Sequence, residues 1–371
     1  MDPRSFGRHI MSLIEKKDLD EKTSYEMFSD VLLNRQSEVQ QGAFLAALVA
    51  KGETVDELYG AWKAIYELDT IKVQTSLPGP LVENSGTGMD NLYTFNVSTA
   101  SAIVASSLGV IMVRHGARAL TSKCGTVDIL EALGLDVEAP VEKVAESVKE
   151  AGIGLFNGMS AKVHPGALAR ILSKMYFGST FNISASLASP VIPQLAIRGV
   201  YSSRIIEKMA NLMKRIGYEK GMVAHGEVEG LNKGMDEISP CGKTKVIEFS
   251  RDKMTRYELE PEDFGIPRCK LSDIQSKENM EEEVKRFLLV LAGKGSEACV
   301  NFTAINAGAI LYIAEKCGTL LQGKEMAQEA MVSGRAIKKL VQWVSIQDHP
   351  EKKGLNVLLK LLEDLGLKNF L

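Results

Sequence analysis

At 371 residues, with 45% hydrophobic and 25% charged residues, the chain has the composition of a soluble globular protein with one large or two ordinary domains. Its net charge of −3 argues against general binding of nucleic acid or an anionic membrane, and no apolar run resembles a membrane span or signal peptide. Five cysteines, odd in number and never spaced as C-x-x-C, argue against a zinc site or a disulfide framework and predict free thiols in a reducing cytoplasm: Cys124, Cys241, Cys269, Cys299 and Cys317.

The first seventy residues are predicted to form a small helical domain. Three segments with apolar residues at helical spacing each begin with a hydroxyl residue followed three positions later by Glu or Gln, which is the pattern of a capping box. The three pairs are Thr23 with Glu26, Ser37 with Gln40, and Thr54 with Glu57. The turn-rich segment QTSLPGP then separates a helical domain over 1–73 from a second domain over 74–371.

Short apolar runs alternate with helical patterns beyond residue 80, which predicts an α/β domain with a mostly parallel central sheet. Strands are expected at 81–84, 110–113, 196–201 and 221–225, and helices at 98–108, 126–133, 141–151 and 203–216. The runs TKVIEF and KMTRYELE suggest an antiparallel addition to the sheet. From residue 278 the chain is expected to be helical, ending in an amphipathic extension over 346–371.

The stretch SGTGMDNLYTFNVSTASA lies between a predicted strand and a predicted helix and is rich in small and hydroxylic side chains. Gly86 and Gly88 would let a ligand approach the backbone, and the N–H groups at the helix start would point at an anion. Donors suited to phosphate oxygens come from Asn96, Ser98 and Thr99. A tight turn followed by an N-cap is the alternative, but the clustering of these groups favours a phosphate site.

A second polar stretch, RHGARALTSKCGTVD at 114–128, follows the next predicted strand. Its cations and hydroxyl groups also suit phosphate: Arg114, Arg118, Lys123, Thr121, Ser122 and Thr126. A solvated basic face is the alternative. Because open α/β sheets bind ligands beyond the carboxyl ends of their strands, two such loops on neighbouring strands predict a ligand with more than one phosphate.

The adjacent carboxylates Asp236 and Glu237, in the segment NKGMDEIS, are a candidate Mg²⁺ site. Mg²⁺ prefers oxygen ligands and is often shared with substrate phosphates. Most Asp-Glu pairs are ordinary surface charge. This pair becomes a candidate only together with the predicted polyphosphate site, because a diphosphate needs counter-charge.

Taken in this order, the motifs resemble those of the anthranilate phosphoribosyltransferases, within the wider group of nucleoside-phosphorylase-like glycosyl transferases. The family has a GTGGD loop, an N-x-S-T helix start, a KHGN-R segment, a K-S-G-S-A-D-x-L-E stretch and a distal D-E pair. The chain has corresponding residues at 86–90, 96–99, 114–118, 123–131 and 236–237. The resemblance implies a helical domain joined by a segment near 165–192, a cleft between the domains, and a homodimer formed through the helical part.

The resemblance also implies roles for particular residues. Contacts with 5-phosphoribosyl 1-diphosphate fall on Gly86, Met89, Asp90, Thr94, Asn96, Val97, Ser98, Thr99, Arg114, His115, Gly116, Ser122 and Thr126. Contacts with the acceptor fall on Gly86, Ala117, His164 and Arg170. Mg²⁺, expected as two ions per subunit, would be held by Ser98, Asp236 and Glu237, and the catalytic groups would be Arg114, Asp236 and Glu237.

The implied reaction is Mg²⁺-dependent phosphoribosyl transfer to anthranilate, a step of tryptophan biosynthesis. Diphosphate leaves C1 of the ribose while the amine attacks from the opposite face, through a transition state with oxocarbenium character. The protein positions the reactants and stabilises the departing charge. A neutral aniline nitrogen is already nucleophilic, so no strong base is required.

Several positions depart from the family pattern. Lysine is replaced by Arg114, the second loop glycine by Met89, an asparagine by Ala117 and a serine by Cys124. The acceptor segment is also shorter than in the family and has Ala185-Ser186-Leu187 in place of Gly-Pro-Leu. The donor half of the implied site is therefore nearly intact, whereas the acceptor half is altered.

These departures leave the acceptor open. Either Arg170 or Lys174 could bind the acceptor carboxylate. The alternatives to anthranilate transfer are a phosphoribosyltransferase for another aromatic amine and an enzyme like the pyrimidine-nucleoside phosphorylases, although the latter would not need the Asp236-Glu237 pair. A catalytically silent relative that binds nucleic acid is a further alternative, which the net charge of −3 argues against.

Overall fold

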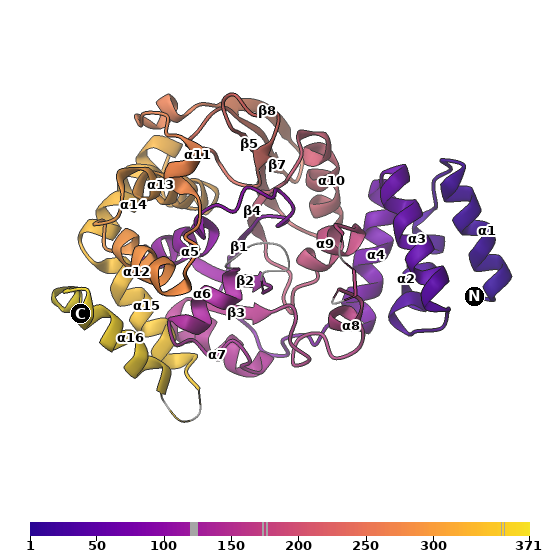
Figure 1. The fold of residues 1–371 in the computed structure, drawn as a ribbon, viewed down its shortest axis with the longest axis horizontal. Helices are drawn as coiled ribbons and strands as arrows, with labels where there is room; N and C mark the ends of the chain where they lie inside the picture. The colour runs from indigo at the N-terminus through magenta and orange to yellow at the C-terminus, as the bar shows by residue number, and fades with distance from the viewer. Residues whose placement is uncertain (119–124, 173, 176, 350, 352) are drawn as a thin grey trace.

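The computed structural model describes residues 1–371 except 119–124, 173, 176, 350 and 352. Figure 1 shows N-terminal helices at one end of the molecule and a larger α/β part, built around a sheet, that carries the C-terminus at the other end. The predicted fold class, a small helical domain followed by an α/β domain with C-terminal helices, is confirmed. Within the described ranges, every helix is too short or too polar to span a bilayer.

The N-terminal bundle consists of α1 (Pro3–Ile14), α2 (Glu21–Leu32), α3 (Glu38–Lys51) and α4 (Val55–Leu68). Aromatic rings fill its centre, because Phe44 packs edge to face against both Phe6 and Phe28 with ring centroids 5.6 and 5.0 Å apart. Phe28 also packs edge to face against Phe181, a residue of the α/β segment, at 5.4 Å. The apolar core of the bundle therefore continues into that segment.

The helix starts agree with the predicted capping boxes only in part. Thr54 and Glu57 form the predicted box at α4, and Ser37 caps α3 through its side chain. The prediction at Thr23 is wrong, since this residue lies inside α2 and its N–H donates to Asp20, the true N-cap, at 2.7 Å. An aspartate caps as well as a threonine and also interacts favourably with the helix dipole, which explains the earlier start.

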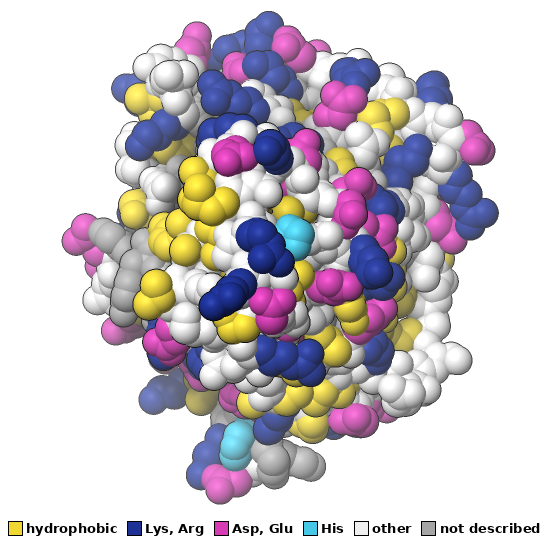
Figure 2. Space-filling view, turned by 90° about the vertical axis from the view of Figure 1, so that its right-hand side faces the viewer, with side chains coloured by type: hydrophobic (Ala, Val, Ile, Leu, Met, Phe, Trp, Pro, Cys, Tyr) yellow, Lys and Arg dark blue, Asp and Glu magenta, His cyan; other side chains and the backbone are white. Residues whose placement is uncertain are grey.

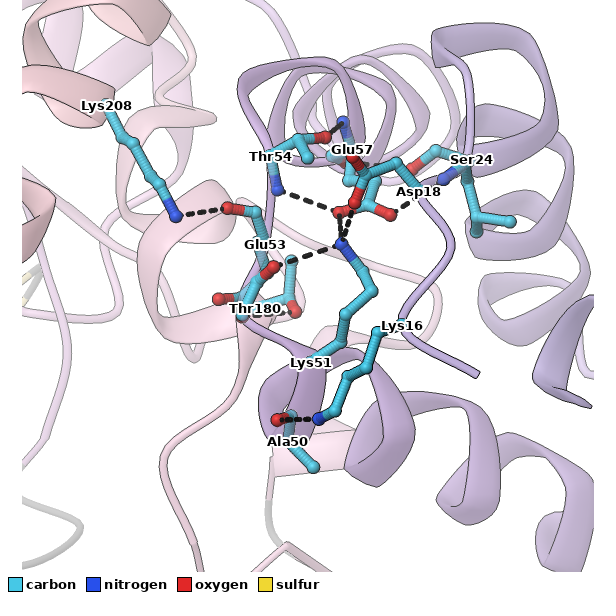
Figure 3. Close-up of polar contacts among 12 residues, drawn as sticks. Lys16, Asp18, Ser24, Ala50, Lys51, Glu53, Thr54, Glu57, Thr180 and Lys208 are labelled. Atoms are coloured by element: carbon cyan, nitrogen blue, oxygen red, sulfur yellow. Dashed lines mark hydrogen bonds and ion pairs between the residues drawn. The ribbon is translucent and has the colours of Figure 1, made fainter. Parts of the chain in front are cut away.

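A buried ion pair ties the helices of the bundle together (Figure 3). The Nζ of Lys51 lies 2.9 Å from Glu57 and 2.6 Å from Asp18, and its side chain is 3% exposed. The Glu57 carboxylate also accepts hydrogen bonds from the backbone N–H groups of Leu19 and Thr54. Because each charge is paired and hydrogen-bonded, the network offsets the cost of burying it.

Glu53 joins the bundle to the α/β part, as Figure 3 also shows. Its carboxylate accepts a hydrogen bond of 2.8 Å from Thr180, at the start of α9 (Thr180–Ser184). Its carbonyl accepts one of 2.7 Å from Nζ of Lys208, on α10 (Ile206–Ile216). These contacts fix the loop between α3 and α4 to two separate elements of the α/β part.

One mixed sheet forms the centre of the α/β part, with the strand order β3-β2-β1-β4-β5-β7-β8 and β6 paired to β5. The parallel strands are β1 (Leu81–Ser85), β2 (Ile111–Gly116), β3 (Ile153–Asn157), β4 (Leu195–Gly199) and β5 (Lys220–Glu227). The antiparallel strands are β6 (Gly234–Met235), β7 (Thr244–Ser250) and β8 (Met254–Leu259), so the predicted antiparallel addition is confirmed.

Both faces of the sheet are covered, as alternating side chains of its strands show. Ala196 and Val223 pack into the core shared with α10 and the N-terminal helices, whereas Ile197 and Ala224 pack into the core of the C-terminal helices. The other helices are α5 (Val97–Ser107), α6 (Thr126–Ala132), α7 (Val141–Ala151), α8 (Leu168–Leu172), α11 (Leu271–Ile274), α12 (Met280–Leu291), α13 (Glu297–Ile313), α14 (Leu320–Val332), α15 (Arg335–Ile346) and α16 (Lys353–Asp364).

Two differences from the expected strands matter for the site. Strand β3, with the sequence IGLFN, was not among the predicted strands, because this apolar run is short and contains a glycine. Strand β2 continues to Gly116, so Arg114 and His115 lie in the strand and not in the loop expected at 114–128. The register explains this extension, since Arg114 pairs with Leu155 and His115 with Phe156 of β3.

The start of the C-terminal extension is anchored by the side chain of Gln347. Its Oε1 accepts hydrogen bonds from the backbone N–H of Leu155 at 3.3 Å and from the indole of Trp343 at 3.0 Å. Its Nε2 donates to the carbonyls of Asp136 and Leu155. The extension is thereby bonded to β3 and to the loop that follows α6.

Candidate functional site

Asp236 and Glu237 follow β6 directly and lie against the carboxyl ends of β1 and β4. Two glycines leave the space that this approach needs, because a Cβ at Gly86 would lie 2.4 Å from the Asp236 carboxyl carbon. A Cβ at Gly199, the last residue of β4, would lie 1.4 Å from the Asp236 carbonyl oxygen. Only glycine fits at either position without moving the acidic segment.

The two acidic residues reach two different parts of the predicted phosphate site. Asp236 accepts a hydrogen bond of 2.6 Å from the backbone N–H of Gly88 and one of 3.2 Å from the Thr87 hydroxyl. Glu237 accepts one of 2.5 Å from the hydroxyl of Ser98, in the first turn of α5. The structure therefore brings together the glycine loop, the helix start and the acidic pair, which the sequence separates widely.

The carboxylates of the site repel one another. Burial and the neighbouring Asp236 raise the pKa of Asp90 to about 7. Burial, followed by the charges of Asp236 and Asp90, raises the pKa of Glu237 well above its usual range. In the described part of the chain, no three His, Cys, Asp or Glu side chains form a cluster that could hold a metal ion. A divalent cation would relieve this repulsion and would take its remaining ligands from substrate and water, which is the usual mode for Mg²⁺.

Arg114 lies close enough to Glu237 for its positive charge to act on that carboxylate, and its side chain is almost fully buried. Its Nη1 donates to Asn84 at 3.1 Å and also to the Ser98 carbonyl, and its Nη2 donates to the Thr126 hydroxyl at 3.4 Å. Burial lowers the pKa of Arg114 to about 10, so the guanidinium remains charged near neutral pH. Arg114 thus supplies positive charge beneath the α5 start and holds Ser98 and Thr126 in position.

The start of α5 is suited to binding an anion. Asn96 occupies the N-cap position but makes no side-chain cap bond, and its Oδ1 accepts a hydrogen bond of 2.6 Å from Thr99 instead. The Thr99 hydroxyl lies 3.3 Å from that of Thr126, the first residue of α6. The N–H of Val97 donates to the Phe95 carbonyl at 2.6 Å, whereas the Asn96 side chain leaves the N–H groups that follow in the first turn of α5 uncapped, at the positive end of the helix dipole. Val97, in contrast, is buried in the core.

The other predicted donor contacts lie around this centre. Met89 packs against the acceptor segment, because its Cε lies 2.2 Å from where a Cβ of Gly178 would be. Thr94 forms an isolated bridge with Gln275. The carbonyl of Gly116 accepts a hydrogen bond of 2.7 Å from the N–H of Gly158. Ser122 lies outside the described residues.

Two histidines face each other beside the end of β2, where the acceptor was expected. Nε2 of His115 lies 3.1 Å from Nε2 of His164, and Nδ1 of His164 donates to the Asp69 carbonyl at 2.7 Å. With that proton on Nδ1, the His164 Nε2 is an acceptor, so the His115 Nε2–H is the donor. Burial, followed by His164, lowers the pKa of His115 to about 3, and burial also lowers that of His164. Both rings are therefore neutral near pH 7.

The remaining predicted acceptor residues are farther apart. Ala117 is exposed just beyond β2. Nη2 of Arg170, on α8, donates to the Val31 carbonyl of α2 at 3.1 Å. Lys174 pairs with Glu38 of α3 at 2.7 Å. Both basic candidates for the acceptor carboxylate thus lie against the N-terminal helices.

Sequence reasoning missed a buried ion pair next to the histidines. Nη2 of Arg198 lies 2.6 Å from the Glu83 carboxylate, both side chains are buried, and the Tyr218 hydroxyl donates to Glu83 at 2.8 Å. Arg198 also reaches Ser186, whose carbonyl lies 3.4 Å from Nδ1 of His115. The sequence contained one indication of this pair, namely an arginine inside the apolar strand run QLAIRG. A buried arginine without a partner would be costly there.

Two family descriptions match the chain in its two parts. Residues 78–337 match the a/b domain of the glycosyl transferase family, and residues 8–68 match the helical bundle domain of the same family. The chain is 34% identical over 337 residues to the anthranilate phosphoribosyltransferase of Geobacillus sp. (strain WCH70), which covers 90% of this chain and 96% of the relative. The enzyme of the same name from Methanothermobacter marburgensis is 33% identical, covering 90% of this chain and 96% of the relative.

Solved structures agree with the sequence relatives. The anthranilate phosphoribosyltransferase of Thermus thermophilus superposes with a TM-score of 0.80 at 31% identity, covering 91% of this chain and 98% of that one. The Saccharomyces cerevisiae enzyme, in complex with PRPP and Mg, has the same fold, with a TM-score of 0.81 at 24% identity over 93% of this chain and 98% of that one. From its length, fold and sequence together, the chain belongs to the anthranilate phosphoribosyltransferase family of glycosyl transferases.

Proposed function

We propose that the protein transfers the phosphoribosyl group of 5-phosphoribosyl 1-diphosphate to the amine of anthranilate, as a step of tryptophan biosynthesis. The products are N-(5-phosphoribosyl)anthranilate and diphosphate. The observation that carries this proposal is the double contact of the acidic pair: Asp236 bonds to the glycine loop at Gly88, and Glu237 bonds to Ser98 at the start of α5. A donor bearing phosphates and Mg²⁺ needs these three parts at one place.

The donor would lie between the glycine loop and the two helix starts. Glycine-loop and α5 N–H groups, with the hydroxyls of Ser98, Thr99 and Thr126, would bind its phosphate oxygens. Ser98, Asp236 and Glu237 would hold Mg²⁺, two ions in our proposal, and bound Mg²⁺ neutralises charge on the departing diphosphate. The neighbouring carboxylates fit such an ion, because burial and then their mutual repulsion raise the pKa of Asp90 and Glu237.

In the reaction the bond from C1 to the diphosphate oxygen breaks while a bond from the amine nitrogen to C1 forms. Arg114 remains charged in its buried position and stabilises the negative charge that develops on the leaving group. Burial lowers the pKa of His115 to about 3 and also lowers that of His164, so these linked rings are weak bases that would position the acceptor and not take its proton. An aniline nitrogen needs no strong base to attack.

The acceptor would lie beside the donor, next to the end of β2. Our assignment places Gly86, Ala117, His164 and Arg170 around the acceptor. Ala117 and the altered segment around Ser186 favour the second candidate, a phosphoribosyltransferase for another aromatic amine. This candidate shares the donor site and differs only in the group that attacks C1.

We further propose a cytoplasmic homodimer assembled through the helical domain, taken as 1–73 with the segment near 165–192. Figure 2 views the molecule from the side of the N-terminal helices and shows hydrophobic side chains gathered between charged ones. Exposed apolar side chains of α1 and α3 support this interface, namely Met11, Ile14, Val39 and Val49. Sedimentation analysis of the wild-type protein and of Val39→Glu tests the dimer.

The activity is tested by following the loss of anthranilate fluorescence with donor and Mg²⁺ present. Turnover is expected in the wild type and lost in Asp236→Ala and Glu237→Ala. Asp252→Ala, an exposed carboxylate in the β7–β8 turn, is the matched control that retains turnover. Donor binding by calorimetry without anthranilate turnover favours another amine, whereas absence of donor binding contradicts the phosphoribosyl site itself.

A further inference from the structure

Two cysteines that are far apart in sequence touch close to the acidic pair. Sγ of Cys241 lies 3.4 Å from Sγ of Cys269, and the backbone N–H of Cys269 donates to the carbonyl of Pro240 at 3.0 Å. Cys241 is buried, whereas Cys269 is partly exposed. Adjacent backbones and touching sulfurs are what a disulfide between them requires.

Cys241 belongs to the short segment that carries Asp236 and Glu237. Asn306 holds this segment from the other side, because its side chain accepts from the N–H of Ile238 and donates to the Ile238 carbonyl at 3.1 and 3.0 Å. The Cys241 N–H is bonded to the Ser239 hydroxyl at 3.0 Å. A change at Cys241 is thus passed through a short, hydrogen-bonded segment to the acidic residues.

Cys269 belongs to the segment that supports the phosphate site. The N–H of Phe95 donates to the Ile274 carbonyl at 2.7 Å, and the N–H of Ser276 donates to the Tyr93 carbonyl at 2.7 Å. Between these bonds Thr94 is bridged to Gln275. The stretch just before Asn96 and the α5 start therefore rests on the chain that follows Cys269.

The pKa values of the two thiols are shifted in opposite directions. The hydrogen bond from Cys241 lowers the pKa of Cys269, and the same hydrogen bond together with burial raises the pKa of Cys241. Cys269 is therefore the thiol that ionises first, and it is also the one that solvent reaches. A low-pKa, accessible thiol beside a second thiol is the arrangement of a redox-sensitive pair.

We propose that Cys241 and Cys269 form a reversible disulfide that joins the segment of the acidic pair to the segment beneath the phosphate site. Ionised Cys269 attacks a low-molecular-weight disulfide such as glutathione disulfide, forming a mixed disulfide and releasing one thiol. Cys241 then gives up its proton and attacks Cys269, releasing the second thiol. Two cysteine thiols are oxidised and one external disulfide is reduced.

The expected effect on the donor rests on the proposed function. Closing the sulfurs from 3.4 Å to a bond of about 2.05 Å draws the two segments together. Displacements of about 1 Å cost up to a hundredfold in rates that depend on positioning. The oxidised protein should therefore bind donor with Mg²⁺, or turn over, at least about tenfold less well than the reduced protein.

The disulfide itself is tested without any activity measurement. The full chain is incubated with glutathione disulfide or with dithiothreitol, its remaining thiols are alkylated, and its peptides are mapped by mass spectrometry. A peptide linking Cys241 to Cys269 is expected only after oxidation, and it should be lost in Cys269→Ala. Cys317→Ala, which removes a thiol elsewhere in the fold, is the control that keeps the link.

Among the described cysteines, Cys299 also lies near Cys269, and its Sγ donates to the Asp273 carbonyl at 3.6 Å. A link from Cys269 to Cys299, a glutathione adduct that never resolves, or two unmodified thiols in the folded protein would each overturn the proposal. If the link forms but calorimetry finds equal donor affinity in both states, the coupling to the site is wrong. If neither state binds donor, the proposed function fails while the peptide map still decides the disulfide.

Discussion

The carboxylate of Asp236 accepts a hydrogen bond of 2.6 Å from the backbone N–H of Gly88, although the two residues are 148 positions apart. This bond joins the glycine loop, which follows β1, to the segment that follows β6. The contact is possible because Gly86 has no side chain, and it places a negative charge where a divalent cation and phosphates are expected to meet.

Replacing Gly86 with alanine should abolish donor binding. The new Cβ would lie 2.4 Å from the Asp236 carboxyl carbon, so the acidic segment or the loop must move. Calorimetry with the donor and Mg²⁺ measures the loss, and thermal unfolding checks that the fold is kept. Gly42→Ala is the matched control, because a Cβ at this position in α3 would contact nothing within 4 Å. Unchanged donor affinity in Gly86→Ala would contradict the assigned site.

The stability of the metal-free protein should depend on the protonation of Asp90. Its pKa is raised from 3.8 to about 7, so between these values the folded state holds a proton that the unfolded chain has released. The contribution of Asp90 to the free energy of unfolding should therefore fall as the pH rises through this range and level off above about 7. Because the pKa values of Glu237, His115 and His164 are also shifted, this contribution is obtained as the difference between the wild type and Asp90→Asn. Urea unfolding with a chelator present, below and above pH 7, measures this slope.

Asp90→Asn should remove the Asp90 contribution to that slope, because asparagine keeps the acceptor for the Leu92 N–H and carries no charge. Asp252→Asn serves as the comparison and should keep the wild-type slope. Since a cation favours ionised carboxylates, the affinity for donor with Mg²⁺ should rise with pH through about 7 in the wild type. A wild-type slope in Asp90→Asn would show that another group titrates.

Breaking the buried ion pair between Glu83 and Arg198 should strongly destabilise the fold. Removing one partner of such a pair leaves an uncompensated charge and typically costs about 3–5 kcal/mol. We expect this loss in Glu83→Gln by urea unfolding, and substantial recovery in the double variant Glu83→Leu, Arg198→Met. The exposed pair of Arg256 and Glu207 is the comparison, whose removal should change stability little. Equal effects at both pairs would contradict the importance of burial.

Replacing Arg170 and replacing Lys174 should have different effects on the KM for anthranilate. If Arg170 binds the acceptor carboxylate, Arg170→Ala should raise the KM for anthranilate about tenfold or more, since a hydrogen bond to a charged group contributes about 1.5–3 kcal/mol. The KM for the donor should stay unchanged. Lys174→Ala, which removes the pair with Glu38, is the matched control. The reverse result would assign the carboxylate to Lys174.

Local patterns in the sequence predicted much of the fold. The helix Val141–Ala151 has the predicted bounds and ends at Gly152, whose φ of 71° suits a glycine. The box of Thr54 and Glu57 is also local, because both partners lie within one turn. Prediction failed where two residues compete for the same role, as Asp20 replaces Thr23 at the cap of α2.

The donor half of the candidate site could be predicted because its residues lie in short motifs, whereas its geometry could not. The family resemblance implied that Ser98 and Glu237 meet at a metal, but no pattern in the sequence indicates that Arg198 pairs with Glu83 or that Cys241 touches Cys269. Each pair joins segments that come together only when parallel strands align their carboxyl ends and the antiparallel strands return the chain beside them. The sequence by itself therefore determined most of the elements, the family and the chemical groups, because these depend mainly on neighbours along the chain. Only the tertiary structure decided which groups meet, because sheet order and close packing set those distances.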